Sequence, residues 1–338
     1  MLPYTHEQKE ENKFEARLLT PSDYKGFAPV YNDFRTRATD EYKFELEPLE
    51  FEDFADAVSK NLIECLVLFE NTIPVAFLVY TTAISEAIEL NIIHSFRMEN
   101  VVERAIYLVK KFLELTKNER QEKIVCYPML GSQKNLISDI AQFGFKFVGL
   151  AVLRFMMSGT NSREILKITE LSEISDEYTF TQWDRKYFDD AVEVVQEGFE
   201  NSADALFDPR FKTIKGTKDI MDKIVNDLYA EFLPEATTVM LHNGTPVGFC
   251  FMNLTGGTIA NIPIVSIKKD HQGKGLSKHM LKKSVEKLIN WADSGEKRIL
   301  EVNTTTETNN FQALKMYRHL GFKEDYNYPQ SYLPVKND

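Results

Sequence analysis

Residues 262–281 of this chain read IPIVSIKKDHQGKGLSKHML. The run Ile262–Ile267 is rich in β-branched residues and predicts a strand. Gly273 and Gly275 can adopt backbone angles that other residues avoid, so they predict a tight turn. Apolar residues then recur at helical spacing from Leu276 to Ile289 and predict a helix. The unpaired N–H groups at the start of such a helix, together with its dipole, favour an anion.

The charge around this turn supports an anion site. Residues 268–287 hold seven lysines and two acids, a net charge of +5, whereas the whole chain carries −11. Lys274, Lys278 and Lys282 repeat every four residues and therefore share one helix face. A basic spot in an acidic protein favours a small ligand that bears phosphate. The alternative is a solvated lysine face on a surface helix.

Length and composition exclude several classes of protein. A chain of 338 residues with 43% hydrophobic and 27% charged residues is typical of a two-domain globular protein. The net charge of −11 argues against nucleic acid and anionic membranes as partners. Three cysteines stand singly in apolar runs, which favours small core residues over a disulfide or metal set: Cys65, Cys126 and Cys250.

The N-terminus and the hydropathy pattern indicate where the protein works. Residues 1–12 are polar and acidic, so we expect no signal peptide. No apolar run approaches the roughly 20 residues that span a bilayer. We therefore expect a cytoplasmic protein.

Two motifs resemble those of a known family. Gln272-x-x-Gly275-x-Ser277 resembles the pyrophosphate loop of the GNAT superfamily of acyl-CoA-dependent N-acyltransferases, Gln/Arg-x-x-Gly-x-Gly/Ala. Residues 310–322, NFQALKMYRHLGF, resemble the family block Asn-x-x-Ala-x-x-x-Tyr-x-x-x-Gly-Phe. Ser277 departs from the pattern, but serine is small enough for a close approach of the cofactor.

The order of predicted elements occurs twice along the chain. Residues 74–77 (PVAF) match residues 246–249 (PVGF), and residues 143–145 (FGF) match residues 320–322 (LGF). Two matches in the same order predict a tandem duplication. With the duplication, the resemblance implies the fold class: α/β with mixed α+β sheets, in two tandem GNAT-like domains, each a splayed mixed sheet flanked by helices. We place them at residues 1–165 and 178–338, with a polar linker at 166–177.

The N-terminal copy lacks the motifs of the C-terminal one. Residues 95–101, where the loop should lie, read SFRMENV and contain no glycine. Counted back from Gly144, the tyrosine, asparagine and alanine positions hold Ile140, Gln133 and Leu136. We therefore expect a degenerate domain that supports its partner, shapes the substrate cleft or binds something else.

The individual elements of the C-terminal copy are also predicted. We expect an irregular segment at 158–177, a helix at 219–232, strands at 260–267 and 298–303, and a tail that begins at Phe322. The resemblance implies that acyl-CoA lies between those two strands, where the family carries a bulge. Pro263 fits either that bulge or an ordinary strand start.

The resemblance also implies the site residues. The backbone after the bulge would hold the acyl and pantetheine amides, the loop would hold the pyrophosphate, and Asn310 would cap the last helix and touch the cofactor. The expected cofactor-binding residues are Val265, Ser266, Ile267, Gln272, Gly273, Lys274, Gly275, Leu276, Ser277 and Asn310.

Tyr317 is the expected catalytic residue. In the family this tyrosine protonates the leaving thiolate, and a phenol with a pKa near 10 suits that task. The alternative is a core tyrosine, because Ala313, Tyr317 and Leu320 share a helix face.

The general base is not evident from the sequence. The usual glutamate position holds Asn261, which cannot accept a proton. Another carboxylate, a water chain or an amine that is already neutral must then serve. Glu200, Asp204 and Asp208 lie in the expected substrate wall, where they attract a cationic amine or form a solvated acidic loop.

Together these features predict a function. We expect an acetyltransferase that moves an acetyl group from acetyl-CoA to a primary amine of a small molecule or peptide. Transfer would be direct, in a ternary complex, without a metal or a covalent enzyme intermediate. The alternative is a non-catalytic acyl-CoA-binding regulatory or scaffold protein. A tandem pair favours a monomer over a homodimer.

Overall fold

The computed structural model describes residues 14–82, 87–96, 99–158 and 160–335. It divides into two compact units: an N-terminal unit of residues 1–146 with 331–338, and a C-terminal unit of residues 147–330. The polar stretch at 1–12, expected to carry no signal peptide, lies outside the described residues. Within the described ranges, no helix has the length and apolar character needed to cross a membrane.

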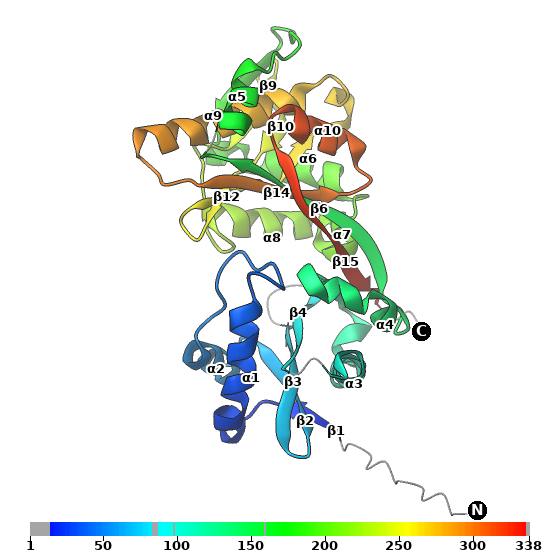
Figure 1. The fold of residues 1–338 in the computed structure, drawn as a ribbon. Helices are drawn as coiled ribbons and strands as arrows, with labels where there is room; N and C mark the ends of the chain where they lie inside the picture. Colours follow the sequence, from blue (N-terminus) through cyan, green and yellow to red (C-terminus); the bar gives the residue numbers. More distant parts are fainter. Residues whose placement is uncertain (1–13, 83–86, 97–98, 159, 336–338) are drawn as a thin grey trace, which may run out of the picture. The chain divides into compact units, whose positions relative to one another are not determined.

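The N-terminal unit is a sheet with helices on both faces (Figure 1). Its strands lie in the order β1-β2-β3-β4-β5, with β4 and β5 parallel and the other neighbours antiparallel. Helices α1 and α2 cover one face, and α3 covers the other. The elements are β1 (Phe14–Leu18), α1 (Tyr24–Arg37), α2 (Phe51–Ser59), β2 (Glu64–Glu70), β3 (Ile73–Thr81), β4 (Ala87–Ser95), α3 (Val101–Leu115), β5 (Ile124–Pro128) and α4 (Ile137–Ala141).

The C-terminal unit holds two sets of strands. One set runs β15-β6-β14-β12-β11-β8, and the other runs β13-β10-β9-β7. The elements are β6 (Lys146–Met156), α5 (Thr160–Ile168), β7 (Tyr178–Gln182), α6 (Phe188–Phe199), α7 (Asp204–Phe207), α8 (Ile214–Val225), β8 (Glu231–Phe232), β9 (Thr238–His242), β10 (Thr245–Cys250), β11 (Asn253–Thr255), β12 (Ile259–Asn261), β13 (Val265–Ile267), α9 (Leu276–Ser294), β14 (Glu301–Glu307), α10 (Phe311–His319) and β15 (Lys323–Leu333).

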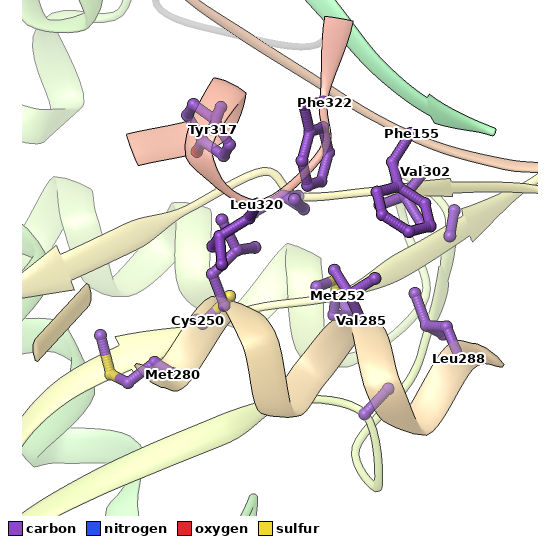
Figure 2. Packing of buried hydrophobic residues seen from close by; sticks show 14 of the residues in the cluster. Phe155, Cys250, Met252, Met280, Val285, Leu288, Val302, Tyr317, Leu320 and Phe322 are labelled. Atoms are coloured by element: carbon purple, nitrogen blue, oxygen red, sulfur yellow. The ribbon is translucent and has the colours of Figure 1, made fainter. Parts of the chain in front are cut away.

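The apolar face of α9 forms the centre of the C-terminal core. Figure 2 shows Met280, Val285 and Leu288 of this helix pointing toward the sheet. All three are fully buried, and burial of such side chains stabilises the fold by roughly 1.5–3 kcal/mol each. The same cluster includes Tyr317, so the expected catalytic residue is attached to a rigid core.

The strand expected at 260–267 is interrupted. β12 ends at Asn261 and β13 begins at Val265, with Pro263 in the gap. β12 pairs in parallel with β14, whereas β13 pairs with β10 in the other set of strands. Because proline cannot donate to a ladder, the break at Pro263 is where the strand leaves β14 and the sheet splays.

The domain boundaries differ from those that the sequence predicts. β6 pairs with β14 along seven residues, from Leu150 opposite Glu307 to Met156 opposite Glu301. It therefore belongs to the C-terminal unit, not to a domain ending at residue 165. The chain end from Ser331 belongs to the N-terminal unit, where Ser331 Oγ donates to the Tyr127 carbonyl at 3.0 Å.

Four local predictions need correction. The segment expected to be irregular contains α5, and the helix expected at 219–232 runs from 214 to 225, because Thr213 caps it by accepting the Gly216 N–H. The strand expected at 298–303 covers 301–307, where it pairs with β6. The expected tail is the long strand β15.

Candidate functional site

The edge of β13 supplies free backbone groups at the splay. Phe251 N donates to Ile264 O and Lys268 N donates to Val247 O, both at 2.9 Å. In an antiparallel ladder these bonds alternate, so Val265 and Ile267 turn their own N–H and C=O groups away from β10. Gln272 Nε2 already binds Ile267 O, so the N–H and C=O of Val265 are the pair that suits an amide of an extended ligand.

Ser266 does not face the splay. Its backbone lies opposite Phe249, and its Oγ donates to Val194 O of α6 at 2.8 Å. Successive side chains of a strand point to opposite faces, so the Ser266 side chain points away from the face to which Val265 and Ile267 point. The expectation that Ser266 binds the cofactor therefore has no support in its geometry.

The glycine turn forms the expected cradle at the start of α9. Gly273 and Gly275 have φ of +77° and +75°, the left-handed region in which side chains are strained. Gln272 Nε2 donates to Ile267 O at 2.8 Å and so fastens the turn to the end of β13. The helix begins at Leu276, and its first N–H groups have no partner within the helix.

These parts meet in one cavity of about 510 Å³, within the range of small-molecule sites. The expected residues that line it are Val265, Ile267, Gln272, Gly273, Gly275, Leu276, Ser277, Asn310 and Tyr317. Lys274 does not line it, because its Nζ reaches Tyr178 Oη at 3.2 Å. Nor does Lys282 turn to the cavity, since it donates to Thr169 O at 2.9 Å.

Tyr317 lies in the wall of this cavity and is only 5% exposed. Thr304 Oγ1 lies 3.4 Å from Tyr317 Oη and 3.3 Å from Ile262 O. Burial is the main cause that raises the pKa of Tyr317 above its ordinary value, and the contact with Thr304 opposes this. The phenol therefore keeps its proton at neutral pH and can give it to a stronger base.

Two asparagines have local roles. Asn310 Oδ1 accepts the Ala313 N–H at 3.1 Å, so it caps α10 while also lining the cavity. Asn261 Nδ2 donates to Thr255 Oγ1 at 2.6 Å and does not line the cavity. The position that carries a glutamate in the resembled family is thus turned to β11.

Two carboxylates line the cavity. Asp204 is among the acids that the sequence placed in the substrate wall, and it does reach the cavity. Glu307 was missed, because it lies beyond the strand expected at 298–303. The extension of β14 to Glu307, opposite Leu150 of β6, brings it there.

The comparisons with known proteins agree with this geometry. Residues 204–322 match the model of the Acetyltransferase (GNAT) family. These residues form a GNAT-family domain. No protein of curated function matches the chain by sequence.

Solved structures resemble the fold over 96–98% of the chain. A GCN5-related N-acetyltransferase from Sphaerobacter thermophilus is 15% identical, with a TM-score of 0.64 over 96% of both chains. A tandem GNAT protein from the clavulanic acid biosynthesis pathway is 12% identical, with a TM-score of 0.58 over 96% of this chain and 100% of that one. A fungal glucosamine N-acetyltransferase region is 10% identical, with a TM-score of 0.62 over 98% of this chain and 40% of that one.

The strand register identifies the N-terminal counterpart of the β13 edge. Leu78 of β3 lies opposite Ile93 of β4, just as Cys250 of β10 lies opposite Val265 of β13. Since the two hairpins also match in sequence, Ile93 corresponds to Val265. Its backbone groups are already bound, because Gln133 Oε1 accepts the Ile93 N–H and Gln133 Nε2 donates to Ile93 O, both at 3.0 Å.

Gln133 is held firmly in that position. It is 4% exposed, and Tyr127 Oη donates to its Oε1. In the N-terminal unit a side-chain amide thus makes the pair of hydrogen bonds that Val265 leaves open in the GNAT domain. The start of α3 keeps the left-handed turn without glycine, through Asn100 at φ +54°. Arg97 and Met98 of the expected loop lie outside the described residues.

Proposed function

We propose that the GNAT domain transfers an acetyl group from acetyl-CoA to a primary amine of a small molecule or peptide. One observation carries the proposal: a single cavity is lined by Val265 of the β13 edge, by the glycine turn and by Tyr317. These groups match the amides, the pyrophosphate and the thiolate that an acyl-CoA substrate presents.

The residues fit acetyl-CoA chemically. The turn from Gly273 to Ser277 offers backbone N–H groups and a helix N-terminus to phosphate oxygens, while the Gln272 N–H donates to Lys269 O. Val265 offers one N–H and one C=O to an amide of the pantetheine arm. Acetyl-CoA itself supplies the activated acyl group as a thioester.

Transfer is direct in this proposal. The amine nitrogen attacks the thioester carbonyl, the C–S bond breaks with its electron pair on sulfur, and Tyr317 gives its proton to the thiolate. The raised pKa of Tyr317 keeps that proton in place until the thiolate forms. Holding both substrates in one cavity makes the attack effectively unimolecular.

A non-catalytic acyl-CoA-binding protein is the second candidate. The observation that favours it is Asn261, which replaces the family's usual base and is bound to Thr255. In this case the domain would bind acetyl-CoA and release no CoA.

A thiol-release assay separates the two. Purified protein is incubated with acetyl-CoA and, in turn, ethanolamine, spermidine, glucosamine and a lysine-containing peptide. Steady CoA release with at least one amine supports the transferase. Acetyl-CoA binding without release from any amine of a broad panel supports the binding protein.

A further inference from the structure

The acceptor side of the cavity is acidic. It is bounded by residues 202–204 at the start of α7 and by residues 304–307 at the end of β14. The cavity lining, taken over the described residues, includes two carboxylates, Asp204 and Glu307, and neither lysine nor arginine. This wall therefore attracts an ammonium group and repels an anionic acceptor.

Glu307 is fixed in this wall by the backbone. Its Oε1 accepts the Ala203 N–H at 3.2 Å, which ties the start of α7 to β14. A carboxylate has about four acceptor positions, so most of them remain available to a ligand. A second hollow of about 630 Å³ shares Ser202, Ala203 and Glu307 with the cavity. Glu307 thus stands where an acceptor could enter from that side.

Asp204 is held less tightly. Its Oδ2 accepts a hydrogen bond from Ser202 Oγ at 3.3 Å. The residue is exposed, and it lines the cavity. Desolvation is the main cause that raises the pKa of Asp204, repulsion from Glu307 and Asp208 adds to it, and the Ser202 contact opposes it.

Two other acids near this wall are already paired, and Lys212 lines the second hollow but not the cavity. Glu200 accepts from Lys269 Nζ at 3.2 Å. Asp208 binds Arg210 Nη2 at 2.6 Å, and Arg210 also binds Asp219. Asp204 has no cation of this kind in the described contacts, so its carboxylate is the one best placed to gain a proton.

We propose that Asp204 removes the proton of the acceptor amine and that Glu307 binds its ammonium form, which makes the acceptor a cationic primary amine. The inference rests on the proposed function and assigns the base that Asn261 cannot be. The ammonium ion loses one proton to the Asp204 carboxylate. The amine then forms the C–N bond, and the thiolate leaves and takes the Tyr317 proton. The second proton of the nitrogen restores the Tyr317 hydroxyl, and the proton on Asp204 is released. One proton passes to water in each turnover.

The test compares Asp204→Asn and Glu307→Gln with Asp189→Asn. Asp189 is a surface acid of the same unit, its side chain 83% exposed and paired with Lys218, so it controls for loss of charge. CoA release is measured from pH 5.5 to 9.5 with the best amine among ethanolamine, spermidine, glucosamine and the peptide. Binding of acetyl-CoA is measured separately, as the shift of the thermal unfolding midpoint.

Asp204→Asn should lower kcat/KM by about 10²-fold at pH 7 and leave the acetyl-CoA shift unchanged. The loss should shrink at high pH, where the amine is already neutral, and Asp204→Glu should recover part of the rate. Glu307→Gln should raise the amine KM by about tenfold with a smaller change in kcat. Asp189→Asn should match the unaltered protein in CoA release and in the thermal shift with acetyl-CoA.

Two failures can be told apart. If the unaltered protein and Asp204→Asn release CoA at rates within threefold, the assignment of Asp204 is wrong and the transferase stands. If the unaltered protein binds acetyl-CoA but releases no CoA with any amine, the proposed function is wrong and the assignment falls with it.

Discussion

Replacement of Tyr317 by phenylalanine separates a catalytic acid from a core tyrosine. The ring packs 5.3 Å from the Phe322 ring, centroid to centroid, and phenylalanine keeps that contact. Only the hydroxyl is lost, together with its contact to Thr304 Oγ1 at 3.4 Å, which is long for an O–H···O hydrogen bond. Thr304 retains its contact with Ile262 O at 3.3 Å. We therefore expect a loss in the free energy of unfolding of at most about 1 kcal/mol.

The effect on rate should be much larger. General acid catalysis contributes about 10²–10⁴-fold, and loss of the acid raises the barrier by the corresponding roughly 3–5 kcal/mol. kcat should fall by that factor, while the thermal shift with acetyl-CoA should stay within a degree of the unaltered protein. The assay is CoA release at saturating acetyl-CoA and amine, with urea unfolding of the same preparations.

A matched control removes a hydroxyl elsewhere. Tyr187 lies just before α6 and does not line the cavity, so Tyr187→Phe should leave kcat unchanged. A Tyr317→Phe protein whose kcat stays within threefold of the unaltered protein would refute the acid role and leave Tyr317 as a core residue. Equal losses in both variants would show that the effect is not specific to Tyr317.

Three further predictions concern the N-terminal unit. Gln133→Leu should lower the free energy of unfolding by about 2–5 kcal/mol, because it leaves the buried N–H and C=O of Ile93 unpaired, and a loss below 1 kcal/mol in urea titrations would contradict this. Isothermal titration should give one acetyl-CoA per chain, because Gln133 already binds the backbone groups of Ile93 on β4. Two equivalents would show that acetyl-CoA displaces Gln133 there. Burial, with repulsion from Arg37, lowers the pKa of His94 to about 3 in the folded protein. Below pH 6.5 the histidine of the unfolded chain binds a proton that the folded protein does not, so the free energy of unfolding should fall as the pH drops. His94→Gln should lessen that fall between pH 7 and 5, and an unchanged fall would contradict the assignment.

The glycine turn could be predicted from sequence because its physics is local. Gly273 and Gly275 need left-handed backbone angles, and the apolar period of α9 follows at once. The break at Pro263 was also readable, since a missing N–H must lie outside a ladder. These features lie where we propose that the cofactor binds.

The acceptor side depended on long-range pairing. Glu307 reaches the cavity because β14 extends along β6, where it lies opposite Leu150, 157 residues earlier in the sequence. No local pattern predicts that pairing. The sequence of β14, Glu301–Glu307, is mostly polar and lacks the apolar alternation of a half-buried strand. The residue pattern of β15 gave only a tail from Phe322, because its sequence is largely polar and aromatic; the family resemblance alone implied C-terminal strands at about 325–334.

The N-terminal unit illustrates what a motif search alone leaves out. The sequence showed that Gln133 stands in the asparagine position, but only the register of β3 and β4 reveals that its amide binds the counterpart of Val265. Likewise the sequence placed Ser266 among the cofactor-binding residues with Val265 and Ile267. Only the structure shows that its hydroxyl donates to Val194 O instead.

The central claim is that acetyl-CoA binds at the glycine turn of the GNAT domain. The most direct test is the thermal unfolding midpoint with and without 1 mM acetyl-CoA, for the unaltered protein, Gly275→Glu and Gly295→Glu. Gly295 ends α9 at φ +74°, so glutamate there meets the same backbone strain as at Gly275, roughly 28 Å away along the 19-residue helix. The control thus separates strain from loss of the anion site.

A ligand at 100 times its Kd stabilises the native state by about 2.7 kcal/mol, a shift of several degrees. The account predicts that shift for the unaltered protein and Gly295→Glu, and none for Gly275→Glu, whose carboxylate repels phosphate. A shift that survives in Gly275→Glu, or no shift in the unaltered protein, would contradict it.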